Sequence, residues 1–153
     1  MRKPEFVYTT YIKTTPDKLW LALTDREFTL SYWFGCSLHS DWKVGSPMQM
    51  HKGGKVVNEC VILESDPPRR LVYSWLSVFD EDMIKERPSR VTFVLEQEHS
   101  AVKLTVTHEG FADGSKTLPS ISGGWPLVLS SLKSILETGK PLVFQEACDA
   151  ESA

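Results

Sequence analysis

The 153-residue sequence predicts an α+β fold in which an antiparallel sheet packs against one long C-terminal helix. The first observation is a series of strand-like runs, separated by tight-turn signals, that fills residues 46–111. The second is a stripe of apolar residues with helical spacing near the C-terminus. The third is a pair of short helical segments after the first strand. Because strands joined by tight turns pair as neighbours, the sheet is expected to be a meander.

The N-terminal region predicts a strand followed by two short helices. The run EFVYTTYIKTTP, residues 5–16, is rich in β-branched and aromatic residues, as strands are. A helix is expected to begin after Thr15, because its hydroxyl can cap the helix, Pro16 suits the first turn, and Asp17 lies near the positive end of the dipole. A second helical segment, REFTLSYWF, ends at Gly35.

The middle of the sequence predicts strands joined by short turns. Gly53 and Gly54 in KGGK are a strong hairpin signal. Pro67 and Pro68 in DPPRR indicate a second turn, since neither can donate to a strand ladder. The charged run DEDMIKERPS is a connection, and HSA is a tight turn. The strands are expected in SPMQMH, KVVNECVILESD, LVYSWLSVF, RVTFVLEQE and VKLTVTHEGF.

The segment WPLVLSSLKSILETGKPL, residues 125–142, predicts the long helix. We expect Pro126 to lie near the first turn, where a missing N–H costs little, and Gly139 to end the helix. Leu132 is expected to be buried, whereas the neighbouring Ser131 is expected to tolerate alanine. The apolar residues recur every three or four positions and so share one face. They are Ile121, Trp125, Val128, Leu132 and Ile135.

Composition places the chain among ordinary globular proteins. With 41% hydrophobic residues and a formal net charge of −3, it lacks the basic footprint of a nucleic-acid-binding protein. No apolar run approaches the roughly 20 residues that span a bilayer, and no secretory signal is recognisable. The three scattered cysteines are expected to be reduced, as in a cytoplasmic protein. We expect one domain over residues 1–141 and a frayed tail over 142–153.

The order of these elements, together with four motifs, resembles a known family. The motifs are TTPDKLWLALTD with the YWF that follows it, ESDPPRRLVYSW, THEGF, and the GGW expected to open the last helix. Over about residues 6–141 they resemble the AHSA1-like branch of the START-like (SRPBCC) superfamily, named for the activator of Hsp90 ATPase. The resemblance implies a helix-grip fold, in which a curved sheet wraps the C-terminal helix. It also implies a hydrophobic or aromatic ligand, lipid- or polyketide-like, between the helix and the sheet.

His108 is the polar residue whose placement matters most. In VKLTVTH, strand alternation puts Val106 and His108 on the face toward the helix and Glu109 on the opposite face. The histidine and the glutamate are therefore not a catalytic pair by position. We expect His108 at the mouth of the space between helix and sheet, either as a structural residue or as a ligand contact. Gly110 then lets the backbone leave the sheet, and Phe111 packs back.

Aromatic residues are the main candidates for a ligand site. Each one taken singly is typical of a core. A sheet curved around one helix, however, leaves a concave apolar space of the kind that ligands occupy. The residues expected to line this space are Trp33, Tyr73, Trp75, Phe93, His108, Phe111, Trp125, Val128 and Leu132.

Signals for other kinds of site are weak. Cys36 and His39 are three residues apart, but no paired CxxC or HxxxH accompanies them, so no metal is expected. KGGK lacks the spacing of a phosphate-binding loop. The sequence has no G-x-S-x-G, and no serine or cysteine nucleophile is placed by the sequence beside a histidine. No catalytic residue and no cofactor are assigned.

Two functions remain open. The first, which we favour because the expected cavity-facing positions are almost all apolar, is non-catalytic binding of a hydrophobic small molecule. The second is a cyclase- or hydrolase-like enzyme that uses His108 or Glu59 as general acid or base in the same cavity. Two titratable groups facing the cavity would favour the enzyme. The resemblance also implies a chaperone-associated module as an alternative partner role, and a homodimer is compatible with each function.

Overall fold

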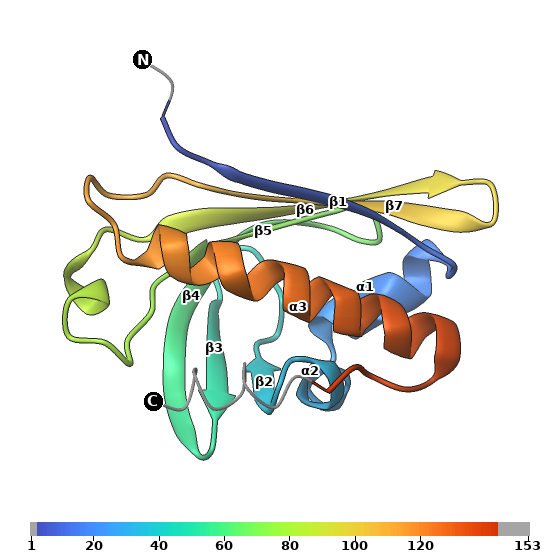
Figure 1. Ribbon diagram of the computed structural model, residues 1–153, viewed down its shortest axis with the longest axis horizontal. Helices are drawn as coiled ribbons and strands as arrows, with labels where there is room; N and C mark the ends of the chain where they lie inside the picture. Colours follow the sequence, from blue (N-terminus) through green and yellow to red (C-terminus); the bar gives the residue numbers. More distant parts are fainter. Residues whose placement is uncertain (1–2, 144–153) are drawn as a thin grey trace.

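The computed structural model describes residues 3–143 and has the helix-grip architecture (Figure 1). Seven antiparallel strands form one curved sheet in the order β1-β7-β6-β5-β4-β3-β2. The long helix α3 lies across this sheet with α1 and α2 beside it (Figure 1). The strands are β1 (Phe6–Ile12), β2 (Cys36–His39), β3 (Pro47–Lys52), β4 (Lys55–Asp66), β5 (Arg70–Trp75), β6 (Ser89–Glu98) and β7 (Ala101–Glu109). The helices are α1 (Pro16–Thr24), α2 (Arg26–Tyr32), the 3-10 turn η1 (Met83–Lys85) and α3 (Thr117–Thr138).

The two short helices begin with side-chain caps. The Thr15 hydroxyl accepts a hydrogen bond from the Lys18 N–H at 3.3 Å, so the predicted cap of α1 is confirmed. Asp25 follows α1 and caps α2 by accepting from the Phe28 N–H at 2.9 Å. A single residue thus ends one helix and starts the next, which turns the chain sharply and brings the end of α2 toward α3.

Burial alternates strictly along β7. On β7, Val102, Leu104, Val106 and His108 are fully buried, as the alternation predicted. The hairpin between β3 and β4 turns at Gly53 and Gly54, both of which have positive φ. Such backbone conformations are open to glycine without steric cost, which explains the strength of this turn signal.

Helix α3 begins at Thr117, earlier than the sequence predicted. The expectation that Pro126 lies near the first turn is wrong, because Pro126 is inside the helix and Pro119 occupies its first turn. Gly123 and Gly124, taken as part of the motif opening the helix, also lie within it. Local composition predicted a loop here, since Gly, Pro and Ser are poor helix formers.

Long-range polar contacts at the start of α3 explain the difference. The Ser115 hydroxyl accepts from the N–H groups of Thr117 and Leu118 at 3.0 and 3.2 Å and donates to Glu86 at 2.6 Å. Glu86 also accepts from the Lys116 N–H at 3.1 Å. The helix is therefore capped in part by the β5–β6 connection, 29 or more residues away along the chain, which local sequence does not reveal.

Strand β2 was not predicted. It is an edge strand of four residues that pairs with β3 from Cys36 opposite Lys52 to His39 opposite Gln49. A run this short is too brief to establish a period of two, so only its pairing with β3 defines it.

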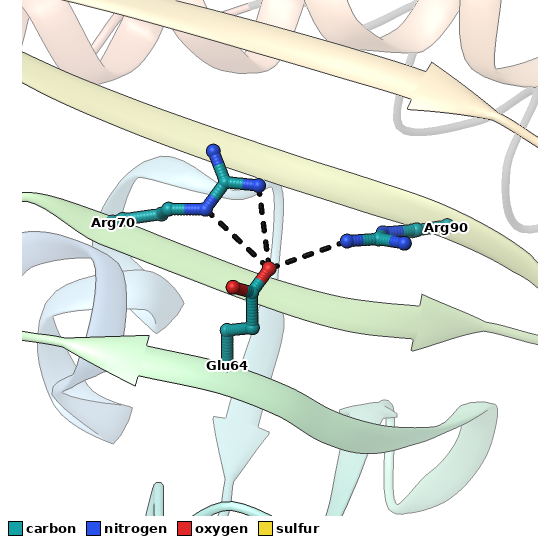
Figure 2. Close-up of polar contacts among 3 residues, drawn as sticks. All are labelled: Glu64, Arg70 and Arg90. Atoms are coloured by element: carbon teal, nitrogen blue, oxygen red, sulfur yellow. Dashed lines mark hydrogen bonds and ion pairs between the residues drawn. The ribbon is translucent and has the colours of Figure 1, made fainter.

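The outer face of the sheet carries a charged cluster (Figure 2). The Glu64 carboxylate on β4 accepts from Arg70 on β5 at 3.3 Å and from Arg90 on β6 at 3.2 Å. All three side chains are between 42% and 48% exposed, so the cluster lies in solvent rather than in the core. Among residues 3–143, no helix is both long and apolar enough to cross a membrane.

Candidate ligand-binding site

An aromatic cluster joins α3 to the sheet. Trp125, at the middle of α3, has its ring 5.5 Å from Trp33 at the end of α2 and 5.5 Å from Trp75 on β5. Phe93 on β6 lies 5.8 Å away in an edge-to-face arrangement. These separations are those of favourable aromatic pairs. Trp125 of α3 therefore contacts the end of α2 and strands β5 and β6.

A chain of hydrogen bonds runs through the same region. The Trp125 indole N–H donates to His108 Nδ1 at 3.1 Å, and His108 Nε2 lies 2.7 Å from the Ser89 hydroxyl. Since an indole can only donate, Nδ1 must accept and Nε2 carries the proton. Ser89 in turn donates to the Trp75 carbonyl at 3.4 Å. These hydrogen bonds connect helix α3 to β7, β7 to β6, and β6 to β5.

His108 is a buried neutral residue rather than one at a cavity mouth. Its side chain is fully enclosed, and its ring stacks on Phe111 at 4.8 Å. Burial lowers the pKa of His108 from 6.5 to about 3, since desolvation disfavours the charged imidazolium. The expected position at the rim was wrong because the β7 strand end is covered by Phe111 and Trp125. The expectation that Phe111 packs back is confirmed.

A cavity of about 100 Å³ lies between α3 and the β2–β5 side of the sheet. On the helix it is lined by Ile121, Gly124, Trp125 and Val128, and on the sheet by Met50, Val57 and Trp75. Trp33, at the end of α2, also lines the cavity. Phe79 and Ser120 are exposed lining residues, so they lie on the side of the cavity that faces solvent. Drug-sized pockets commonly measure about 300–1,000 Å³. This cavity is therefore much smaller than a drug-sized pocket.

Polar groups also border the cavity. They are Cys36, Lys52, Asn58, Ser77 and Ser120. Within residues 3–143, two buried side-chain atoms lack a hydrogen-bond partner, Asn58 Oδ1 and Trp75 Nε1. Both residues line this cavity. Buried polar atoms are nearly always paired in folded proteins, so two unpaired atoms at one cavity are unusual.

The structure divides the predicted site residues into two groups. Trp33, Trp75, Trp125 and Val128 line the cavity. The others are buried in the core and are not among the lining residues; they are Tyr73, Phe93, His108, Phe111 and Leu132. The difference arises because side chains fill the space between α3 and strands β6 and β7, whereas the cavity lies on the β2–β5 side of the sheet.

Asn58 is a site residue that the sequence analysis missed. It shares the inner face of β4 with Cys60 and Ile62, and all three are buried. A polar amide at an apolar position of an alternating strand is a recognisable signal, because a buried amide needs partners. Gly124, in contrast, lines the cavity by lacking a side chain.

The proposed proton carriers do not face the cavity. Both ring nitrogens of His108 are engaged, and Glu59 is exposed on β4, at a position next to the inward-facing Asn58 and Cys60. Cys36 and Lys52 are the titratable residues among those that line the cavity. Burial raises the pKa of the nearby Cys60 thiol to about 12. The lining residues therefore include no histidine or carboxylate. They do include the two titratable groups expected of an enzyme, a thiol and an amine, but neither belongs to the proposed proton carriers His108 and Glu59.

The residues considered for a metal do not converge. Cys36 is buried, whereas His39 is half-exposed and stacks on His51 with ring centroids 4.0 Å apart. Nε2 of His39 lies 2.8 Å from the Ser37 hydroxyl. Within the described part of the chain, no group of three or more His, Cys, Asp or Glu residues could hold a metal ion.

The family model for activator of Hsp90 ATPase homolog 1-like proteins (AHSA1) matches residues 13–137. The chain belongs to the AHSA1 family. The match covers the two short helices, the whole meander and nearly all of α3, so it includes every residue that lines the cavity of this AHSA1-family chain. A comparison with curated proteins found no match.

Solved structures with the same fold come from several sources. The Aha1 dimer from Colwellia psychrerythraea is 20% identical, with a TM-score of 0.74 over 90% of this chain and 98% of that one. The HSP90 activator PFC0360w from Plasmodium falciparum is 22% identical, with a TM-score of 0.72 and coverages of 86% and 95%. DynU16, a protein in the dynemicin biosynthetic locus, is 23% identical with a TM-score of 0.72, and this chain covers 48% of it. At these identities the likeness establishes the fold.

Proposed function

We propose that this AHSA1-family chain binds a small aromatic molecule, without catalysis, in the cavity between α3 and the sheet. The observation that carries the proposal is the cavity itself, which is walled by Trp33, Trp75 and Trp125. Apolar concave sites with a few polar groups are where small ligands bind. A lipid or polyketide would have to insert one ring or chain end, because the volume is only about 100 Å³.

The three indoles make aromatic ligands the best match. Ring centroids of Trp33 and Trp75 each lie 5.5 Å from Trp125, in edge-to-face and tilted arrangements. A ligand ring can join such a cluster with the same geometry, gaining about 0.5–1.5 kcal/mol per aromatic pair beyond burial. Met50 adds a polarisable thioether that packs favourably against rings.

Glycine positions in α3 provide a sharp test with toluene as the probe. A Cβ built at Gly124 meets nothing within 4 Å, and Gly124 lines the cavity, so Gly124→Leu should direct its side chain into the cavity. Gly123 is adjacent, equally open, and not among the lining residues, so Gly123→Leu is the matched control. Both changes should raise helix propensity by a similar amount, about 1 kcal/mol.

We expect toluene to shift tryptophan indole resonances in two-dimensional NMR spectra of the native chain and of Gly123→Leu. Gly124→Leu should bind toluene at least about tenfold more weakly, because the leucine occupies the volume that the ring needs. Equal toluene binding by both variants would contradict the proposal, as would failure of toluene, anisole and phenol all to bind the native chain.

A chaperone-associated role is the second candidate, and membership of the AHSA1 family favours it. Its test is calorimetric titration of the chain against an Hsp90 protein, with sedimentation of the chain alone to measure whether it forms a homodimer. Gly124→Leu should leave such binding unchanged if the cavity and the chaperone surface are separate.

A further inference from the structure

We infer that the cavity selects aromatic molecules that carry a hydroxyl group, that is, phenols. The inference rests on the proposed function and names the ligand class. Its basis is that two residues lining the cavity, Asn58 and Trp75, each carry a buried side-chain atom without a hydrogen-bond partner among residues 3–143, one an acceptor and the other a donor. Each such atom costs free energy while it has no partner, so a ligand that pairs both is favoured over one that pairs neither.

The acceptor is the side-chain oxygen of Asn58. This residue is 5% exposed, and its Nδ2 donates to the Met50 sulfur at 3.0 Å. A thioether can only accept, so the amide nitrogen must face Met50 and the oxygen is the end left without a partner. Met50 therefore fixes the orientation in which Asn58 offers an acceptor.

The donor is the indole N–H of Trp75. Its neighbour Trp125 has the same group paired with His108, which shows that the aromatic cluster can satisfy an indole when a partner is built in. Trp75 is 7% exposed, and its Nε1 has no such partner. An indole N–H can only donate, so its complement must be an acceptor.

The two groups lie on neighbouring chain segments. Asn58 pairs with Ser77 in an isolated antiparallel bridge, which places Trp75 diagonally across from Asn58. Diagonal neighbours in antiparallel pairs are about 7–8 Å apart at their Cα atoms, within reach of long side chains. Since both residues line the same cavity, one ligand can contact both.

A hydroxyl is the group that matches this pair. Its oxygen accepts from Trp75 while its O–H donates to Asn58. A carboxylate cannot donate to Asn58, and an ammonium cannot accept from Trp75. The volume limits the rest of the molecule to at most one ring, because an engineered cavity of about 150 Å³ holds benzene, whereas this cavity measures about 100 Å³.

The test compares phenol, anisole and toluene by NMR titration of the native chain. Phenol can make both hydrogen bonds, anisole can only accept, and toluene can make neither. We expect phenol to bind at least about tenfold more tightly than toluene, with anisole between them, because each hydrogen bond adds a modest net gain. The Trp75 indole resonance should move most with phenol.

Two variants remove one partner each. Trp75→Phe keeps the aromatic packing and Asn58→Leu keeps the size, and in each the preference for phenol over toluene should fall to within about threefold. Trp20→Phe, at a half-buried tryptophan of α1 that does not line the cavity, should keep the full preference. If Asn58→Leu does not fold, Trp75→Phe alone decides.

The outcomes separate this inference from the proposed function. If toluene binds and phenol is not preferred, Asn58 Oδ1 and Trp75 Nε1 form hydrogen bonds with water rather than with a ligand hydroxyl. That result would overturn the inference while the proposed function stands. Failure of all three probes to bind would overturn both. A phenol preference that survives in both Trp75→Phe and Asn58→Leu would also overturn the inference, because the hydroxyl would then be recognised elsewhere.

Discussion

At the scale of single residues, His108 shows how burial converts a titratable group into a structural one. Its Nδ1 accepts from Trp125 and its Nε2 faces Ser89, so both nitrogens serve the attachment of α3 to the sheet. The neutral form is the one that fits these partners, because a protonated Nδ1 could not accept the indole N–H.

Stability should therefore fall as the pH falls through the range where the unfolded chain takes up this proton. Burial lowers the folded-state pKa of His108 to about 3 from an ordinary 6.5, so stability is lost between about pH 6.5 and about pH 3. The slope should approach about 1.4 kcal/mol per pH unit. Urea unfolding of the native chain and of His108→Gln from pH 7.5 to 5 measures it.

His108→Gln should be less stable at neutral pH and should show a flatter dependence on pH. His99→Asn, at an exposed turn residue with positive φ, should keep the native slope. Parallel pH curves for the native chain and His108→Gln would show that the histidine does not titrate as described.

At the scale of elements, α3 is the helix that the curved sheet holds. Its buried face includes Ile121, Trp125, Val128, Leu129 and Leu132. Ser131 is also fully buried, and its hydroxyl accepts from the Leu142 N–H at 3.2 Å. The expectation that Ser131 tolerates alanine did not account for this burial. Ser131 is buried because the chain after the helix folds back over it.

Leu132→Ala should destabilise the fold by about 2–5 kcal/mol, as large-to-small substitutions in well-packed cores do. The side chain is completely buried against the sheet, so the lost contacts are not replaced by solvent. Ser130→Ala, at a half-buried position of the same helix, should change stability by no more than about 0.5 kcal/mol. Similar free energies of unfolding for the two variants would show that α3 packs through another face.

At the scale of the whole molecule, the two faces of the sheet have different roles. The inner face holds α3 and the cavity, whereas the outer face carries the Glu64–Arg70–Arg90 cluster that ties three neighbouring strands together (Figure 2). Ion pairs this exposed are screened by water and salt, so they contribute little to stability.

Glu64→Gln should lower stability by at most about 1 kcal/mol at low salt, and the difference should shrink in about 1 M NaCl. Urea unfolding at both salt concentrations measures it, with Glu98→Gln, at an exposed residue at the end of β6, as the control. A larger loss that persists at high salt would mean that Glu64 supports the sheet by something other than charge.

The sequence alone determined the α+β fold class, the strand alternation and the helix stripe, because these follow from local periods of two and about 3.6 residues. It also determined the cap at Thr15 and the hairpin at Gly53 and Gly54, whose causes lie within a few residues. Four of the nine residues expected to line the cavity do so, and two of them, Trp125 and Val128, belong to the predicted stripe of the long helix.

Only the tertiary structure decided where the cavity is and which polar atoms border it. Trp125 covers His108 from 17 residues away along the chain, and Glu86 reaches the start of α3 from 30 residues away. Likewise, side-chain atoms of Asn58 and Trp75 are unpaired because the fold of residues 3–143 places no hydrogen-bond partner beside them. Periodicity predicts which face a residue occupies, whereas the residual space and the unmet hydrogen bonds depend on how all the side chains pack together.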